Sequence, residues 1–293
     1  MAERLTLALG QFSPVLGRIE PNLERLWDLV DEAAATGADI LLTPELGLTG
    51  YTLRDLVAEV ALNRTSPDLE PVAELSRRLP LTLGFVERGS DGQLYNACGY
   101  WEEGRLVHLH RKVYLPTYGM FEEGRFFARG DRVEAFDSAC GRLVILNCED
   151  IWHPSNAMLA QLGGATGIIL MSAAPGRGVS GATPVLGSRA AWHDILRTFG
   201  RLLLCWTAWI NRVGFEDGIF FSGGSTVYAP YAEEPLVEAP MLAAGITTVT
   251  VDLAEQARLR ADNGQLREED PEIARARLET LLAERLPAGE RTP

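Results

Sequence analysis

The chain has 293 residues, of which 46% are hydrophobic and 23% charged, with a net charge of -13 and a pI of about 4.9. This size and composition are ordinary for a globular α/β protein with a well-developed core. Nucleic acid and anionic membrane surfaces both repel so acidic a chain. We therefore expect neither as a partner, although a single site could still be locally basic.

Apolar segments with the periodicity of strands and helices alternate along the chain. Strands outnumber what one doubly wound sheet uses, and hairpins mix with crossover units, which two sheets packed face to face accommodate. In chain order, the expected elements are strand 5–12, helix 22–35, strand 38–45, helix 67–78, strand 81–87, two strands within 94–113, strand 142–148, helix 155–165, strand 167–174, helix 187–200, strand 202–213, strands 225–230 and 245–253, and helix 271–284.

The last part of the chain differs from the rest. Residues 254–293 are polar and rich in charge, with one amphipathic helix and an expected frayed tail after Pro287. Such a segment cannot bury much of its own surface, so we expect it to pack across a partner subunit. The sequence therefore predicts one domain over residues 1–255 and a C-terminal arm over residues 256–293.

Cysteine usage and hydropathy indicate a cytoplasmic protein. The cysteines at positions 98, 140, 148 and 205 show no CxxC spacing, as expected for thiols in a reducing compartment. Residues 1–12 lack the features of a signal peptide. No run of about 20 apolar residues, the length that crosses a membrane, occurs in the sequence.

Cys148 closes the apolar strand of "LVILNCEDIW" and precedes an expected helix. Ligand sites of α/β proteins cluster at such strand ends, and N–H groups at a helix start favour a thiolate. The two acids that follow, Glu149 and Asp150, should oppose loss of the thiol proton. From position alone, Cys148 is explained equally well as a structural cysteine and as a nucleophile.

A cysteine nucleophile needs a base, because a thiol is mostly protonated at neutral pH. None of the histidines is well placed for this role. Glu45, in "LLTPELGLTGY", ends an apolar strand, where desolvation raises a carboxyl pKa toward that of a general base. Lys112, in "HLHRKVYLP", ends another, where it could stabilise an oxyanion. Each alone is better explained as a solvated charge, but with Cys148 they form a coherent set.

The phrases "PELGLTGY", "RKVYLPTYGMFEEGRFF", "LNCEDIW" and "INRVGFEDGIFFSGGS" resemble the nitrilase superfamily of carbon–nitrogen hydrolases. The resemblance covers nearly the whole chain, to about residue 252. Within the superfamily, "LPTYGMFEEGRFF" and "CEDIW" look most like the glutamine-hydrolysing domain of glutamine-dependent NAD synthetases. The resemblance implies a four-layer αββα sandwich, with two mixed sheets and helices outside, in a homodimer or higher homo-oligomer. It also implies catalysis without a metal or cofactor.

The resemblance gives the motif residues roles. Glu45 would be the base, Cys148 the nucleophile and Lys112 the oxyanion stabiliser, with the backbone N–H of Glu149 completing the oxyanion hole. A second glutamate of the family, which positions the lysine and assists the water step, falls on Glu123. The residues expected to contact substrate are Tyr51, Tyr118, Trp152, Ser172 and Arg177.

Two of these assignments leave alternatives open. Glu122 is adjacent to Glu123 and could be confused with it. Arg177 is suited to bind a substrate carboxylate through two parallel hydrogen bonds, but a surface-loop arginine is an equally good explanation.

NAD synthetases also carry an ATP-using domain with an "SGGxDS" loop, whereas "FSGGSTVY" lacks that pattern and lies within the hydrolase part. The sequence therefore predicts hydrolysis of a small-molecule, non-peptide amide to acid and ammonia through a Cys148 thioester. Three alternatives remain: a glutaminase-like subunit that delivers ammonia to a separate ligase, a nitrilase or N-carbamoyl hydrolase, and a non-catalytic member of the fold.

Overall fold

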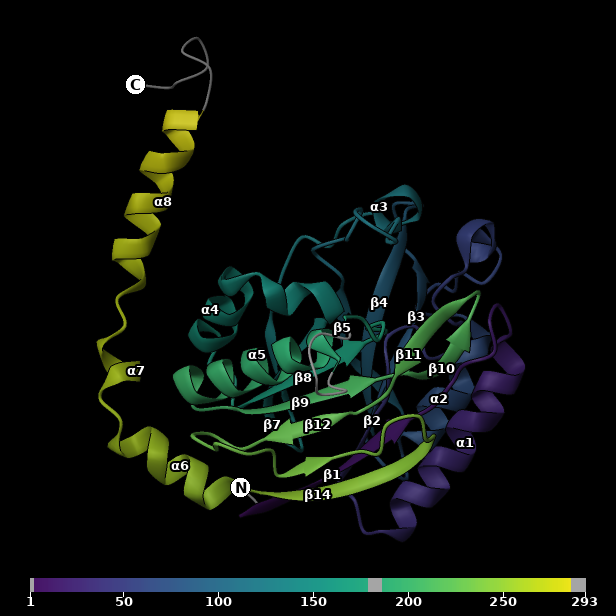
Figure 1. Ribbon diagram of the computed structural model, residues 1–293, viewed down its shortest axis with the longest axis horizontal. Helices are drawn as coiled ribbons and strands as arrows, with labels where there is room; N and C mark the ends of the chain where they lie inside the picture. The colour runs from purple at the N-terminus through teal and green to yellow at the C-terminus, as the bar shows by residue number, and fades with distance from the viewer. Residues whose placement is uncertain (1–2, 179–185, 286–293) are drawn as a thin grey trace. The chain divides into compact units, whose positions relative to one another are not determined.

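The computed structural model describes residues 3–178 and 186–285, and most of its strands form two six-stranded sheets (Figure 1). Residues 1–2, 179–185 and 286–293, which include the expected tail after Pro287, lie outside the described residues. The first sheet consists, in spatial order, of β14 (Gly245–Asp252), β1 (Arg4–Gln11), β2 (Ile40–Leu42), β3 (Leu81–Arg88), β4 (Leu94–Glu102) and β5 (Arg105–Arg111). The second consists of β13 (Val237–Glu238), β12 (Thr226–Tyr228), β9 (Trp206–Asn211), β8 (Gly167–Ser172), β7 (Gly141–Asn147) and β6 (Ala135–Ser138). A separate hairpin pairs β10 (Val213–Glu216) with β11 (Ile219–Ser222).

The two sheets share one pattern of strand directions. In the first sheet, β1, β2 and β3 run parallel, and β14 runs antiparallel to β1 on one side of them. On the other side, β4 runs antiparallel to β3, and β5 runs antiparallel to β4. In the second, β7, β8 and β9 run parallel, with β6 on one side and β12 and β13 on the other. Parallel strands bring the segments that follow them to one edge of the sheet, where ligand sites of α/β proteins form.

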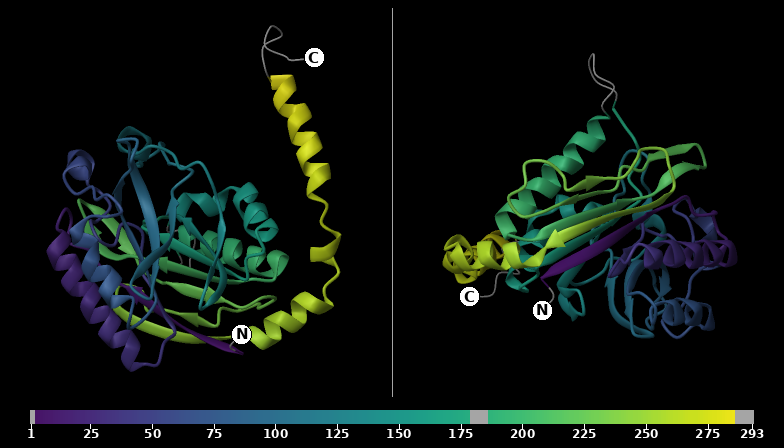
Figure 2. Two further views of the ribbon diagram at one scale, coloured as in Figure 1. Left: turned by 180° about the vertical axis from the view of Figure 1, so that it is seen from behind. Right: turned by 90° about the horizontal axis from the view of Figure 1, so that it is seen from below.

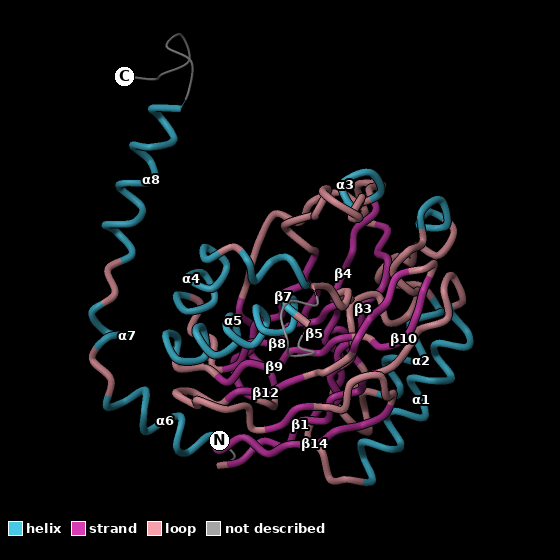
Figure 3. The backbone as a smooth tube through the Cα atoms, viewed as in Figure 1, coloured by secondary structure: helices cyan, strands magenta, loops and turns pink. Residues whose placement is uncertain are grey.

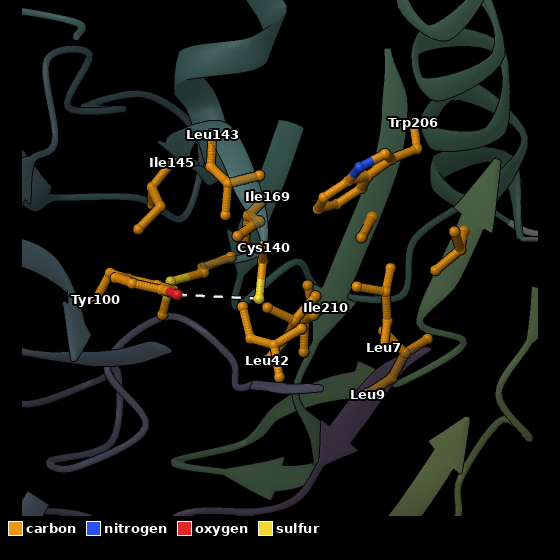
Figure 4. Packing of buried hydrophobic residues seen from close by; sticks show 14 of the residues in the cluster. Leu7, Leu9, Leu42, Tyr100, Cys140, Leu143, Ile145, Ile169, Trp206 and Ile210 are labelled. Atoms are coloured by element: carbon orange, nitrogen blue, oxygen red, sulfur yellow. Dashed lines mark hydrogen bonds between the residues drawn. The ribbon is translucent and has the colours of Figure 1, made fainter. Parts of the chain in front are cut away.

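Inward-facing side chains of both sheets make one apolar core between them (Figure 4). Alternate residues of a strand point to opposite faces, which decides the side chains that enter this core. In β1, Leu7 and Leu9 pack in the core, whereas Ala8 packs on the opposite face. Leu143 and Ile145 of β7 enter from the second sheet. A register slip of one residue would turn these side chains outward, so the core fixes the register.

Helices cover the outer faces of both sheets (Figure 2). α1 (Ile19–Ala35) and α2 (Glu70–Leu75) pack on the first sheet, and α4 (Pro154–Leu162) and α5 (Gly187–Leu203) pack on the second. Figure 3 distinguishes these helix layers from the strands by colour. The expected four-layer αββα sandwich with two mixed sheets is confirmed.

The remaining helices are short or belong to the C-terminal part. They are η1 (Arg54–Ala58), η2 (Pro67–Leu69), α3 (Glu123–Phe126), η3 (Cys148–Trp152), α6 (Leu253–Asp262), α7 (Gln265–Glu268) and α8 (Pro271–Arg285). The chain divides into two compact units, residues 1–256 and 257–293. None of the described helices combines the length and the apolar character needed to cross a membrane.

One expected strand, residues 202–213, is divided among three elements. α5 continues to Leu203, and Leu204 then adopts a left-handed backbone (φ 50°) that ends the helix. β9 begins at Trp206 and ends at Asn211, and β10 follows. An apolar run does not reveal where a helix gives way to a strand, because both are buried.

Gly84 in β3 lets the segment that leaves β2 lie directly against the sheet. A methyl group at Gly84 would lie 2.3 Å from the backbone nitrogen of Leu46 and 3.0 Å from the carbonyl carbon of Glu45. Leu46 itself has a left-handed backbone (φ 48°). The orientation of Glu45 therefore depends on a residue without a side chain beneath it.

We predict that Gly84→Ala destabilises the protein by about 2 kcal/mol, because the clash is with backbone rather than with a flexible side chain. Urea unfolding measures the change. Gly200→Ala in α5 is the matched control, since its new methyl group would meet its nearest neighbour at 3.4 Å. Alanine favours a helix, so this control should be neutral or stabilised by up to about 1 kcal/mol. Equal stability of the two variants would contradict the close approach.

Candidate active site

Three strand ends bring Glu45, Lys112 and Cys148 together. Glu45 follows β2 and Lys112 follows β5, both in the first sheet, whereas Cys148 follows β7 in the second. Glu123 comes from α3, further along from Lys112. The group is therefore built from both sheets at the edge where these strands end. Among residues 3–178 and 186–285, no group of three or more His, Cys, Asp or Glu side chains is placed to hold a metal ion.

A buried lysine ammonium lies between two carboxylates. Lys112 Nζ is 2.7 Å from Glu45 Oε1 and 2.7 Å from Glu123 Oε1. All three side chains are at most 5% exposed. Asn96 Nδ2 donates to Glu45 Oε1 (2.8 Å), and the Ala173 N–H donates to Glu45 Oε2 (2.8 Å). One ammonium group thus contacts two carboxyl groups, and fixed donors orient Glu45.

Cys148 occupies a strained turn at the start of η3. Its backbone is left-handed (φ 48°), which costs a non-glycine residue about 1 kcal/mol or more. Asp150 holds the turn by accepting hydrogen bonds from the Asn147 N–H (3.1 Å) and His110 Nε2 (2.7 Å). It also accepts from the N–H groups of the two residues after Lys112, at 3.1 and 2.9 Å. These bonds tie the turn of the cysteine to the segment of the lysine.

Burial sets the protonation of these groups. Burial and the Glu45 carboxylate hold the pKa of the Cys148 thiol well above its usual value, although Lys112 acts in the opposite direction. Burial also acts to lower the pKa of Lys112, but Glu123 and Glu45 outweigh it and hold that pKa well above its usual value. For Glu123, burial raises the pKa to about 7, against the effect of Lys112. At neutral pH the thiol is therefore protonated and the lysine charged.

Cys148 opens into a pocket of about 520 Å³, counting its open mouth. Tyr118 donates to both carboxylate oxygens of Glu149, at 2.9 and 3.0 Å. The Arg177 guanidinium lies over the ring of Phe121, 4.7 Å from its centre. The pocket therefore presents one acidic and one basic side chain, each in contact with an aromatic ring. Besides Cys148, its lining includes Tyr118, Phe121, Glu149, Trp152, Arg177 and Trp192.

Tyr118, Trp152 and Arg177 thus line the pocket of Cys148, whereas Tyr51 and Ser172, which were also expected to contact substrate, are not among its lining residues. Tyr51 donates to Glu123 Oε1 at 2.6 Å and lines a neighbouring pocket that does not include Cys148. Ser172 ends β8 and is fully buried, where its hydroxyl favours the Cys148 thiolate against the effect of burial on the thiol pKa. Both side chains thus lie against the buried groups, and their contact with substrate stays a prediction.

Two asparagines that were not expected from the sequence connect the sheets. Asn147 Nδ2 donates to Asn96 Oδ1 at 2.8 Å, and Asn96 in turn donates to Glu45. Both asparagines are fully buried. A signal was present, because asparagine is unfavourable within a strand and a buried one needs hydrogen-bond partners. Asn96 stands in the middle of the apolar strand "LYNACGYW".

Residues 6–261 match the family described as carbon–nitrogen hydrolase. The chain belongs to this family. This carbon–nitrogen hydrolase is 31% identical over 262 residues to the glutamine-dependent NAD(+) synthetase of Thermotoga maritima. The aligned region covers 88% of the chain and 44% of that protein. Its identity to the Acinetobacter baylyi synthetase is 28% over 222 residues, 75% of the chain and 39% of that protein. The resemblance inferred from the motifs is confirmed, and the chain spans less than half the length of these relatives.

Solved structures share the fold of this carbon–nitrogen hydrolase. A carbon–nitrogen hydrolase from Helicobacter pylori G27 has a TM-score of 0.82 at 22% identity, covering 94% of the chain and 98% of that protein. The glutamine-dependent NAD+ synthetase from Acinetobacter baumannii has a TM-score of 0.74 at 25% identity, covering 86% and 46%. An amidase from Nesterenkonia sp. AN1 has a TM-score of 0.78 at 23% identity, covering 93% and 96%.

The raised pKa of Glu123 should make the stability of this hydrolase depend on pH. The folded protein keeps the Glu123 proton up to about pH 7, whereas an unfolded chain releases it near its ordinary value of 4.5. The stability contributed by this proton is present below about pH 4.5 and is lost as the pH rises through about 7. Relative to Glu123→Gln, the wild type should lose up to about 3 kcal/mol of unfolding free energy between about pH 5 and about pH 8.

Urea unfolding of both proteins at the two pH values measures this difference. Glu122→Gln is the matched control, because the Glu122 side chain is exposed. The difference in unfolding free energy between this variant and the wild type should be the same at both pH values. A pH-independent difference between the wild type and Glu123→Gln would show that Glu123 is not protonated in the folded protein.

Proposed function

We propose that this chain is an amidase that hydrolyses a non-peptide amide to a carboxylic acid and ammonia through a Cys148 thioester. The observation that carries the proposal is a pocket-lining thiol close to a buried lysine that two carboxylates share. This group supplies a nucleophile, a base and a cationic oxyanion donor, which are the parts that acyl transfer requires.

In the first half-reaction, Glu45 accepts the thiol proton as Cys148 Sγ attacks the amide carbonyl carbon. A preformed thiolate is not needed, because proton transfer accompanies attack and the raised thiol pKa makes Sγ a strong nucleophile once deprotonated. Lys112 and the Glu149 N–H stabilise the negative oxygen, since N–H groups in the first turn of a helix lack partners within the helix. Glu45 then gives its proton to the leaving nitrogen, the C–N bond breaks and ammonia departs.

In the second half-reaction, water hydrolyses the thioester. Glu45 accepts a proton from water as its oxygen attacks the acyl carbon, and the same donors stabilise the oxyanion. The C–S bond breaks, the sulfur takes the proton back from Glu45, and the acid leaves. Glu123 holds Lys112 in place through both halves by its 2.7 Å contact with the ammonium.

A second candidate, a glutaminase-like activity, is favoured by the charges of the pocket. Glu149 and Arg177 line the same pocket as Cys148. An α-amino acid with a side-chain amide carries an ammonium for Glu149 and a carboxylate for Arg177, whose guanidinium binds carboxylates through two parallel bonds. The similarity to glutamine-dependent synthetases supports the same substrate class. In this role the chain would deliver ammonia to an ATP-dependent ligase.

Nitrilase and N-carbamoyl hydrolase activities would use the same side chains and differ in their products. A nitrile takes up two molecules of water and yields the acid and ammonia. An N-carbamoyl amine instead yields the free amine, ammonia and carbon dioxide. Product analysis of one substrate of each class separates them from the amidase.

For the domains and the assembly, we propose a hydrolase domain over residues 1–255, a C-terminal arm over residues 256–293, and a cytoplasmic homodimer or higher homo-oligomer. The family match at residues 6–261 and the two compact units support the division. Leu159, Leu162 and Leu202 of the outer helix layer are 43–46% exposed and support self-association. None of the cysteines, all of which lie in the described residues, is in a disulfide, as expected in the cytoplasm.

We predict that Cys148→Ala lowers amide turnover by a factor on the order of 10⁴ or more, because no other thiol lines the pocket. Ammonia release from a panel of amides measures turnover. The intact mass of the wild type incubated with an amide should increase by the mass of the acyl group, and peptide mapping should place that group on Cys148. Cys140→Ala is the matched control, since Cys140 is buried in the core between the sheets and should keep full turnover. Undiminished turnover by Cys148→Ala would end the proposal.

For the second candidate, we predict that L-glutamine is hydrolysed with a higher kcat/KM than glutaramate, which lacks the amino group. Arg177→Met should raise KM for both by about 10- to 100-fold, whereas Glu149→Gln should raise it for glutamine alone. Turnover of propionamide, which carries neither charge, should be unchanged in both variants. Arg125→Met, at an exposed arginine away from the pocket, is the control. Equal kcat/KM for glutamine and propionamide would contradict this specificity.

A further inference from the structure

Arg212 and Glu216 form a buried ion pair that the proposed chemistry does not use. Arg212 follows β9 and Glu216 ends β10. Arg212 Nη1 lies 2.6 Å from Glu216 Oε2, and the side chains are 0% and 4% exposed. The Nε and Nη2 groups of Arg212 have no hydrogen-bond partner among the described residues. Such a pair contributes little stability, because lost hydration offsets the attraction, so its position points to another role.

The other oxygen of Glu216 holds a turn of the chain. Glu216 Oε1 accepts hydrogen bonds from the N–H groups of Tyr51 (2.9 Å) and Thr52 (2.7 Å) and from the Thr52 hydroxyl (2.9 Å). A methyl group at Gly50, where φ is 80°, would lie 2.8 Å from Glu216 Oε2. The turn therefore approaches the carboxylate closely, and Arg212 fixes that carboxylate through its second oxygen.

The Tyr51 side chain connects this turn to Lys112 through Glu123. Tyr51 donates to Glu123 Oε1 at 2.6 Å, and the same oxygen lies 2.7 Å from Lys112 Nζ. The Tyr51 ring also packs edge-on against Phe221, and the Arg212 guanidinium lies 4.3 Å from the centre of the same Phe221 ring. Arg212 is thus linked to Tyr51 in two ways. Glu216 connects it to the backbone of Tyr51, and Phe221 connects it to the ring of Tyr51.

We propose that Arg212 and Glu216 are positioning residues that fix Tyr51, so that its hydroxyl keeps Glu123 against Lys112. The inference rests on the proposed function, in which Lys112 stabilises the oxyanion. The chain of contacts runs from the pair to the Tyr51 turn, from Tyr51 to Glu123, and from Glu123 to Lys112. Neither Arg212 nor Glu216 lines the pocket of Cys148, so they act only through these neighbours.

The same contacts give the proposal a titration signature. The charged or titratable groups that face Glu123 are Lys112, Glu45, the Tyr51 hydroxyl and the Cys148 thiol. Burial raises the pKa of Glu123, whereas Lys112 and the Tyr51 hydrogen bond lower it. Loss of the Tyr51 hydrogen bond would therefore move this ionisation to higher pH.

The test compares hydrolysis with alkylation in Glu216→Gln and Tyr51→Phe. Hydrolysis of propionamide and L-glutamine forms an oxyanion that Lys112 stabilises, whereas alkylation of Cys148 by iodoacetamide forms none. We expect kcat to fall about tenfold or more with KM unchanged, and the acid limb of the pH profile to move to higher pH. The rate of alkylation should change less than about threefold.

The double variant tests whether the two residues act along one path. If Glu216 acts through Tyr51, Glu216→Gln adds almost nothing in a Tyr51→Phe background, so the double variant should match the slower single variant. Asp217→Asn is the matched control. Asp217 lies on the same hairpin and pairs with Arg54 at 2.8 Å, but it is exposed and does not contact Tyr51, so it should keep the wild-type rate and profile.

Three results would overturn the proposal: effects that multiply in the double variant, an equal fall of hydrolysis and alkylation, or an unmoved acid limb. If Glu216→Gln does not fold, Thr52→Val removes a single donor to Glu216 and is held to the same outcomes. Hydrolysis that survives Cys148→Ala overturns the proposed function and this inference together. Hydrolysis that needs Cys148 but shows no coupling between Tyr51 and Glu216 overturns the inference alone.

Discussion

The site depends on one ammonium group, that of Lys112, buried between two carboxylates. An unpaired charge in a protein interior is strongly unfavourable, and Lys112 is buried at a place that Glu45 and Glu123 both reach. This arrangement brings together the segment after β2, the end of β5 and α3. It also gives the group one net negative charge when all three are ionised. A thiolate would add a second, so burial and the Glu45 carboxylate together hold the Cys148 thiol in its neutral form.

The packing of the two sheets brings this group to the Cys148 thiol. Glu45 and Lys112 belong to the first sheet and Cys148 to the second, so the core between the sheets sets their separation. Polar bonds refine it, since Asn147 donates to Asn96 across the sheets and Asp150 accepts from the backbone after Lys112. The strained turn at Cys148 persists because Asp150 restrains it from both directions. The geometry therefore belongs to the whole domain rather than to the loop of the cysteine.

What could be predicted from the sequence follows from whether the signal is local. Glu45 and Lys112 could be found because each ends an apolar strand, and strand ends are visible in a short window. The motifs then placed them in a known family and gave the fold. The bond from Tyr51 to Glu123 could not be found, because it joins segments far apart in the chain and depends on the exact turn that Glu216 holds. The division of residues 202–213 among three elements failed for another reason, since a buried helix end and a buried strand have the same composition.

The two acids after the cysteine show how identical charges can differ in effect. Asp150 is fully buried, and its carboxylate accepts hydrogen bonds from backbone N–H groups and from His110. Its charge therefore stabilises the turn at Cys148. Glu149 instead lines the pocket, where the Tyr118 hydroxyl donates to its carboxylate and His153 Nε2 lies 4.0 Å from it. Under the proposed specificity for amino acid amides, the substrate ammonium neutralises Glu149 beside the nucleophile. A cation bound there favours the Cys148 thiolate, so the group that selects the substrate would also assist its attack. The same ion pair would then strengthen substrate binding and favour the thiolate, and a substrate without the ammonium lacks both contributions.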